Sequence, residues 1–293
     1  MALALDYTSR TTSKRPKQVP AMPLRLDYKL PRGVPVEIEG LLPQLVRDLS
    51  LAEIERLEVF HGNEKLPLAE LFAVSGNPSD LELEFAGDLS GVHWIGAKLT
   101  AGTIRVDGPA GRHVGSEMSG GTIHVHGNAS DWVGGEMRGG LVHIHGSAGH
   151  LIGSAYRGSR RGMTGGTILV DGPVGNEIGH SMRRGLLAVG GCGDFAGLNM
   201  IAGTILVFGP TGLRTGAGMR RGTIGLLSGQ TPQLLPTFRR GGSDKLLIVK
   251  LLLRELQALD YSFDPALLEA SYQMHHGDEV TIGRGELLLP VLP

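Results

Sequence analysis

Apolar residues recur through the middle of the chain in short alternating runs, and a glycine precedes each run. Ile104 and Val106 follow Gly102 with a polar residue between them, and the same pattern follows Gly121. Such alternation is typical of a β-strand with one buried face. The preceding glycines lie at positions 102, 121, 140, 166, 185, 203 and 222, so they are 19, 19, 26, 19, 18 and 19 residues apart. The pattern predicts a repeated unit of about 19 residues, each contributing one strand.

Each repeat contains two more apolar positions, near offsets 12 and 16 from its glycine. The first set is Val114, Val133, Ile152, Ile178 and Ala196. The second set is Met118, Met137, Tyr156, Met182, Met200 and Met219. Three apolar segments separated by glycines predict one coil of a three-sided parallel β-helix, because glycine adopts corner conformations that a Cβ obstructs. One coil cannot bury its inward face alone, so we expect the coils to stack about 4.8 Å apart with the methionines in the core.

The expected fold is mainly β, a right-handed parallel β-helix of about seven or eight coils with a module at each end. Residues 1–23 are polar and contain several prolines, which predicts an extended arm. Residues 24–80 predict an α+β module, in which Ser50 and Glu53 form a capping box. Residues 81–229 are the glycine-rich β-helix, and residues 230–293 are expected to cap its end with a hairpin and a helix opened by Ser243.

Composition and charge narrow the class of protein. The 293 residues include 46 glycines, about twice the usual share of roughly 7%. The formal net charge of −1 creates no overall field that favours nucleic acid. The single cysteine, Cys192, excludes an internal disulfide and a Cys-rich zinc site. No apolar run has the length of a signal peptide or a membrane-spanning helix. We therefore expect a cytoplasmic protein that binds neither membrane nor nucleic acid.

Two His-x-His pairs, His124/His126 and His143/His145, lie one repeat apart and resemble a metal site. They alternate with inward-facing residues, so we expect them to point outwards, with equivalent histidines stacked closely enough to share a metal. The equivalent positions on the flanking coils are occupied by Arg105 and Asp107, and by Leu169 and Asp171. We expect no carboxylate near enough to complete a ligand set. The ladder is therefore predicted to face a partner protein and to bind no metal. A metal-dependent enzyme built on these histidines is the alternative.

Arginines follow the methionine corners of several repeats. They are Arg138, Arg157, Arg160, Arg161, Arg183, Arg184, Arg220 and Arg221. Arg160 and Arg161 belong to the 26-residue repeat, which has seven more residues than the usual 19. The pattern predicts an arginine-lined edge that docks an acidic partner surface or a polyanionic ligand. A row of solvated corners is the alternative interpretation.

The repeat block with its GTIxVxG and GxxxGxxM units resembles the C subunit of formylmethanofuran dehydrogenase, as do two flanking segments. These segments are "LSLAEIERLEVFHGNEKLPLAELFAVSG" before the repeats and "HHGDEVTIGRGELLLP" after them. The chain is equally similar to the C subunit of the bacterial formyltransferase/hydrolase complex of methylotrophs. The resemblance extends from about Leu24 to the C-terminus. The glycine repeat alone also resembles the C-terminal β-helix domain of glutamate synthase, whose other domains do not appear here.

The resemblance implies a non-catalytic structural subunit in tetrahydromethanopterin-linked one-carbon metabolism. In such a complex, the A subunit hydrolyses or forms a formamide at a metal centre. The formyltransferase (the D subunit) moves the formyl group between tetrahydromethanopterin and a methanofuran-type coenzyme, which has a polyglutamate tail in the bacterial complex. The C subunit packs against the A, B and D subunits, so we expect no catalytic residue, metal or cofactor in this chain. The arginine-rich composition favours the bacterial complex. The C subunit of an archaeal-type dehydrogenase and a glutamate-synthase-like β-helix domain are the alternatives.

Overall fold

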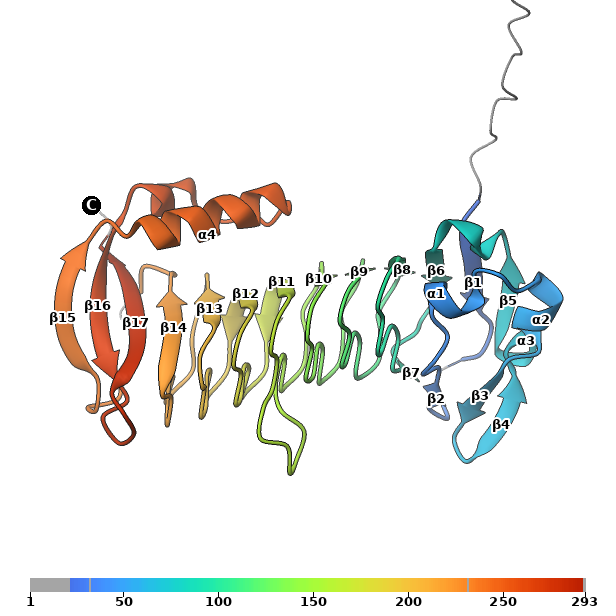
Figure 1. The fold of residues 1–293 in the computed structure, drawn as a ribbon, viewed down its shortest axis with the longest axis horizontal. Helices are drawn as coiled ribbons and strands as arrows, with labels where there is room; N and C mark the ends of the chain where they lie inside the picture. The colour runs from blue at the N-terminus through green and yellow to red at the C-terminus, as the bar shows by residue number, and fades with distance from the viewer. Residues whose placement is uncertain (1–21, 32, 231, 292–293) are drawn as a thin grey trace, which may run out of the picture.

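The computed structural model describes residues 22–31, 33–230 and 232–291 and is mainly β. The molecule is an elongated stack with an N-terminal module at one end and a C-terminal hairpin at the other (Figure 1). The predicted arm at residues 1–23 lies outside the described residues except for Met22 and Pro23. None of the helices in the described ranges is long and apolar enough to cross a membrane.

The N-terminal module combines short helices with two groups of strands. In the large sheet, β1 (Leu24–Tyr28) pairs antiparallel with β5 (Phe72–Ser75) and parallel with β6 (Glu82–Ala86). The small sheet consists of β2 (Val36–Glu37), β3 (Glu58–His61), β4 (Glu64–Pro67) and β7 (Val92–His93). The helices are α1 (Pro43–Val46), α2 (Leu51–Glu55) and α3 (Leu68–Leu71). The predicted capping box is confirmed, because Ser50 and Glu53 exchange side-chain to backbone hydrogen bonds at the start of α2.

The repeats form a parallel ladder in chain order. After β6 its strands are β8 (Thr103–Asp107), β9 (Thr122–Val125), β10 (Leu141–Ile144), β11 (Thr167–Val174), β12 (Leu186–Cys192), β13 (Thr204–Val207) and β14 (Arg221–Leu226). Equivalent residues of successive repeats lie opposite each other, as Ile123 does to Ile104 and to Val142. Neighbouring parallel strands begin at the same edge of the sheet, so the chain returns in a loop after each strand. Figure 1 shows these loops as successive turns of the stack.

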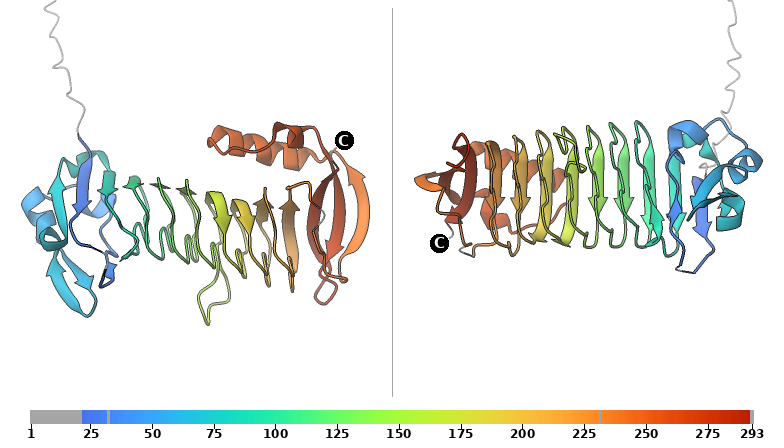
Figure 2. Two further views of the ribbon diagram at one scale, coloured as in Figure 1. Left: turned by 180° about the vertical axis from the view of Figure 1, so that it is seen from behind. Right: turned by 90° about the horizontal axis from the view of Figure 1, so that it is seen from below.

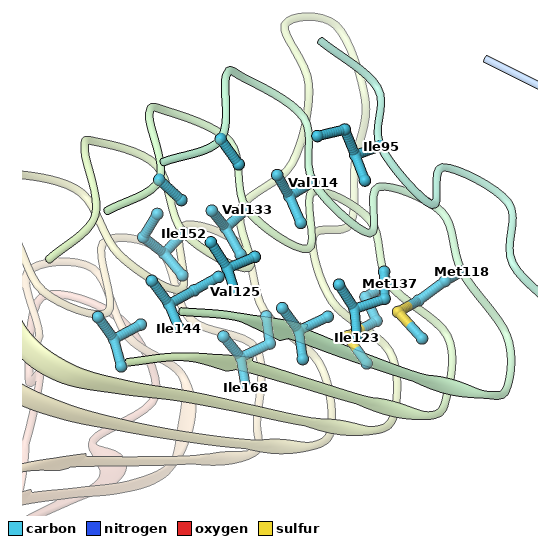
Figure 3. Close-up of a cluster of buried hydrophobic side chains, with 14 of the residues drawn as sticks. Ile95, Val114, Met118, Ile123, Val125, Val133, Met137, Ile144, Ile152 and Ile168 are labelled. Carbon is cyan, nitrogen blue, oxygen red and sulfur yellow. The ribbon is translucent and has the colours of Figure 1, made fainter. Parts of the chain in front are cut away.

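Each turn is also hydrogen-bonded to the preceding turn at two positions outside the strands. The backbone N–H of Gly115 donates to the carbonyl oxygen of Ile95, and that of Arg138 donates to Met118. The same two bonds recur along the stack. Figure 3 shows the side chains near these positions pointing into the interior with those of the strands. The predicted inward residues at offset 12 are all fully buried, which confirms that part of the pattern.

The 26-residue turn departs from the predicted pattern at Tyr156. This side chain is half-buried on the outside, and Met163 takes the inward position. Thr164 N–H donates to the carbonyl oxygen of Met137, and Arg183 N–H donates to that of Met163, so Met163 lies between the methionines of the flanking turns. The prediction for Tyr156 is wrong because the extra residues precede the methionine corner. They form the loop that projects from the stack near β11 (Figure 1).

The C-terminal hairpin closes the end of the ladder. Strand β17 (Arg284–Val291) pairs parallel with β14 and antiparallel with β16 (Ser271–Gly277), which in turn pairs antiparallel with β15 (Arg239–Asp244). Ser243 belongs to β15, so the prediction that it opens the helix is wrong. Helix α4 (Leu247–Ala258) begins four residues later.

Helix α4 covers a face of the stack and not its end, which differs from the expected cap. It lies alongside the last turns of the ladder in Figures 1 and 2. Its buried residues Val249, Leu253 and Leu256 pack against outward-facing residues of the ladder such as Leu169 and Leu206. The outward positions of the last turns are apolar, whereas those of the earlier turns are arginine and histidine, so burying them favours this placement.

Val125→Asp should prevent the chain from folding. Val125 is fully buried in the stack, and burying an unpaired carboxylate costs several kcal/mol. The matched control is His126→Asp, one residue further and exposed. We expect this control to retain the far-ultraviolet circular dichroism spectrum and cooperative melting of the wild type, and Val125→Asp to lose both. An equal loss in the two variants would contradict the inward and outward assignment.

Candidate functional site

The histidine ladder contains a carboxylate that sequence analysis did not expect. His124 on β9 lies opposite His143 on β10, and β11 follows as the next strand. Asp171 of β11 reaches back across one rung, with its Oδ1 2.8 Å from His143 Nε2 and its Oδ2 3.1 Å from His145 Nδ1. The expectation that no carboxylate lies near these histidines is therefore wrong. The expectation was wrong because the side chain of Asp171 points along the stack towards the histidines. Residue spacing does not specify this side-chain conformation.

Three imidazoles lie close together here, and the carboxylate contacts two of them. His124, His143 and His145 each offer one ring nitrogen, and the three nitrogens lie within 4.8 Å of one another. His126 stands beside the group, with its ring stacked on that of His145 at a centroid distance of 4.9 Å. The expected stacking of His126 on His145 is confirmed. We call His124, His143, His145 and Asp171 the histidine–aspartate cluster.

The ladder is less open to a partner than sequence analysis expected. The side chain of His143 is only 2% exposed, and its ring centroid lies 6.4 Å from that of Tyr261, which follows α4. Tyr261 is itself anchored through its hydroxyl, which donates to the carbonyl oxygen of Val170. A partner protein could therefore reach His124, His126 and His145 but not His143.

Burial lowers the pKa of two imidazoles of the cluster, those of His124 and His143. Burial, together with charge repulsion from His143, His145, Arg105 and His126, lowers the pKa of His124 to about 4. Burial also lowers the pKa of His143, against the opposing effect of Asp171. Neutral imidazole has a free lone pair, so rings in this state can accept a hydrogen bond or ligate a metal.

The predicted arginine edge surrounds a groove in the surface. Arg161, Arg183, Arg184, Arg220 and Arg221 line a groove of about 550 Å³ together with small and apolar residues. Each of the pairs Arg183/Arg184 and Arg220/Arg221 follows a buried methionine, and the two pairs belong to turns that are two apart in the stack. Arg161 reaches the groove from the projecting loop. Within residues 22–31, 33–230 and 232–291, no carboxylate forms an ion pair with any of these five guanidinium groups.

The other three predicted arginines lie beside this groove. Arg138 and Arg160 line a second hollow of about 330 Å³, to which Arg161 also contributes. Arg138 is paired with Glu117 at 3.4 Å. Arg157 is exposed on the loop and lines neither hollow. The spacing therefore did not separate the groove residues from their neighbours, and docking at this edge stays a prediction.

Sequence reasoning missed a stack of aromatic rings on another side of the turns. Trp94 and His113 stack with ring centroids 3.9 Å apart, and Trp132 stacks on Tyr156 at 4.8 Å. His113 Nδ1 lies 3.1 Å from the Tyr156 hydroxyl, which donates to Ser116. Burial lowers the pKa of His113 to about 4. The signal was present in the sequence, because residues 94, 113 and 132 are 19 apart.

Comparisons with known proteins define the class. A sequence model of the GXGXG motif family matches residues 90–234. The solved structure of the formyltransferase/hydrolase complex (FhcABCD) from Methylorubrum extorquens with methylofuran contains a chain that is 33% identical, with a TM-score of 0.84. The match covers 92% of this chain and all of that chain. The repeat block is therefore similar to the GXGXG motif family over 145 of the 293 residues, just under half of the chain.

Curated relatives of known name resemble this chain over part of their length. The C subunit of the molybdenum-containing formylmethanofuran dehydrogenase 1 of Methanothermobacter thermautotrophicus is 42% identical over 79 residues, which are 27% of this chain and 20% of the relative. The C subunit of the tungsten-containing formylmethanofuran dehydrogenase 2 of Methanococcus maripaludis is 36% identical over 92 residues, which are 31% of this chain and 34% of the relative. The matched segments thus span a fifth to a third of these relatives. The chain belongs to the family of formylmethanofuran dehydrogenase C subunits, which confirms the resemblance drawn from the sequence.

The low pKa of His124 should make stability depend on pH. The folded state holds this pKa near 4, below the ordinary value of 6.5, so the unfolded state binds more protons between these values. The free energy of unfolding should therefore fall as the pH falls from about 6.5 to 4. Urea unfolding across this range, with a chelator present, measures the dependence. His124→Gln should flatten it more than the exposed control His126→Gln does. A ring titration of His124 near pH 6.5 by NMR would contradict the assignment.

Proposed function

We propose that this chain is the non-catalytic structural C subunit of a formyltransferase/hydrolase complex in tetrahydromethanopterin-linked one-carbon metabolism. The carrying observation is the match over 92% of the chain, at a TM-score of 0.84, to a chain of FhcABCD in complex with methylofuran. The proposed reaction of the whole complex is formyl transfer to a methylofuran-type coenzyme and hydrolysis to formate. The extent of this match favours a transferase/hydrolase complex over a dehydrogenase. The dehydrogenase C subunits are matched over only 27–31% of the chain.

Residues 81–229 serve in this proposal as a right-handed, three-sided parallel β-helix that holds the other subunits in place. Three hydrogen-bonded and inward-facing positions in each turn support the three-sided coil. Right-handedness follows from the strong preference of parallel crossover connections. Residues 24–80 form the N-terminal module, and residues 230–293 form the C-terminal hairpin with the helix that covers one face.

The proposed partners carry the chemistry. The A subunit holds the hydrolytic metal centre, and the formyltransferase binds the tetrahydromethanopterin and methylofuran-type substrates, while the B subunit completes the assembly. The one cysteine of this chain supports a non-catalytic role. Cys192 is buried, and burial raises its pKa to about 11, so its thiol is a poor nucleophile at neutral pH.

The arginine groove is the proposed docking site for an acidic segment, either of a partner protein or of a polyglutamate coenzyme tail. No carboxylate among the described residues pairs with these five guanidinium groups, so they repel one another and bound carboxylates relieve this repulsion. Each guanidinium can also bind a carboxylate with two parallel hydrogen bonds. Ile201 and Ala202, both partly buried, also line the groove, and their apolar side chains lower the local dielectric and strengthen such pairs.

A tagged chain isolated from its native cells should carry the other subunits of a formyltransferase/hydrolase complex with it. Mass spectrometry identifies these subunits, and release of formate from a formylated methylofuran-type coenzyme measures activity. We expect activity in the assembly and none in the chain separated from it. Co-isolation with glutamate synthase subunits, or formate release by the separated chain, would overturn the proposal.

Arg184→Ala/Arg220→Ala should weaken binding of an acidic segment. The probe is fluorescent poly-L-glutamate titrated into the full chain, with affinity measured at several salt concentrations. Loss of two groove cations should lower the affinity and flatten its salt dependence, because fewer ion pairs form on binding. The matched control is Arg47→Ala/Arg56→Ala, which removes two exposed arginines of the N-terminal module. Equal behaviour of the two double variants would place the acidic site elsewhere.

A further inference from the structure

The histidine–aspartate cluster has the geometry of a metal site that the proposed scaffold role does not require. Its residues come from successive rungs of one parallel ladder, with His124 on β9, His143 on β10 and Asp171 on β11. Backbone hydrogen bonds fix the spacing of these rungs. Three ring nitrogens within 4.8 Å of one another need only small side-chain rotations to reach the separation found around one zinc ion.

The surroundings of the cluster hold the rings in place. Asp171 binds both His143 and His145, and carboxylates that orient imidazoles in this way commonly support metal-ligating histidines. Tyr261 packs near the buried His143 and shields one side of the site. The ring of His126 is stacked on that of His145, and this contact limits rotation of the His145 ring on the exposed side.

The local charges favour a cation. Asp171 contacts the cluster, and Asp260 after α4 adds negative charge felt at His143. Arg105, opposite His124 on β8, opposes a cation. Its charge is offset by an ion pair with Glu82 at 3.0 Å. The balance of nearby charges is therefore negative.

We propose that the histidine–aspartate cluster binds one Zn²⁺ ion through His124, His143 and His145, with Asp171 as the residue that positions two of the rings. Imidazole nitrogens suit Zn²⁺ and similar transition metals, whereas Ca²⁺ and Mg²⁺ require mainly oxygen ligands. Three protein ligands leave one coordination position for water or an anion. The ion joins adjacent turns of the stack at the point where the segment after α4 meets the ladder.

Metal titration of the full chain, purified without a histidine tag and stripped with chelator, tests this site. We expect one equivalent of Zn²⁺ in competition with a chromophoric chelator, and a higher melting temperature with Zn²⁺ but not with Ca²⁺ or Mg²⁺. Co²⁺ should give the intense visible absorption of a four-coordinate ion. The assay needs no other protein, so its result is independent of the proposed complex.

Three variants distinguish Zn²⁺ binding at this site from adsorption of Zn²⁺ to surface histidines. His145→Ala should abolish stoichiometric binding, and Asp171→Asn should weaken it by about 10–100-fold. His126→Ala is the matched control, since it removes an exposed neighbouring imidazole outside the ligand set, and it should bind like the wild type. We leave the buried His143 unchanged so that folding is not at risk. Failure of the wild type to bind one equivalent, or equal loss in the His126 and His145 variants, would overturn the proposal.

Discussion

The in-register parallel ladder is the constraint on which the rest of this structure depends. Each turn has an apolar inner surface that becomes buried only when the next turn stacks on it. Stacking in turn requires the backbones to approach closely at the corners. A Cβ on Gly120 would lie 2.4 Å from the carbonyl oxygen of Thr100, and one on Gly139 would lie 2.5 Å from that of Ser119. The glycines are therefore required at these corners for the hydrogen bonds between turns to form.

The same register explains why chemically similar side chains gather on the surface. A residue type that recurs every 19 positions is brought next to its own equivalent, and this produces the stacked histidines and the aromatic stack. The arginine groove instead combines two arginine pairs from turns two apart with Arg161 of the projecting loop. Similar cations placed together repel one another, whereas neutral imidazoles and aromatic rings do not. The ladder thus creates one surface that gains from an anion and another on which three imidazole nitrogens lie close together.

Much of this architecture could be predicted from the sequence, because burial and glycine follow a fixed period. The inward residues at offset 12 and the capping box both came from spacing alone. Tyr156 was misplaced because spacing shows that seven residues are extra but not on which side of the corner they lie. Asp171 was underrated because its rotamer decides whether it reaches the histidines. The position of α4 depends on Leu169 and Leu206 facing outwards, a contact between segments distant in the chain.

The strands at the two ends of the ladder decide whether copies of this molecule can associate head to tail. A parallel stack has a donor edge at one end and a complementary edge at the other, so bare stacks could add to each other head to tail without limit. Here β5 runs antiparallel to β1 and forms the outer strand at one end. At the other end β16 runs antiparallel to β17 and β15 runs antiparallel to β16, so the outer strand β15 again has the direction of the ladder. An incoming parallel stack meets a strand of the opposite direction at the β5 end, and one blocked end is enough to stop head-to-tail addition. The reversal makes the rod a particle of fixed length and not the unit of a filament.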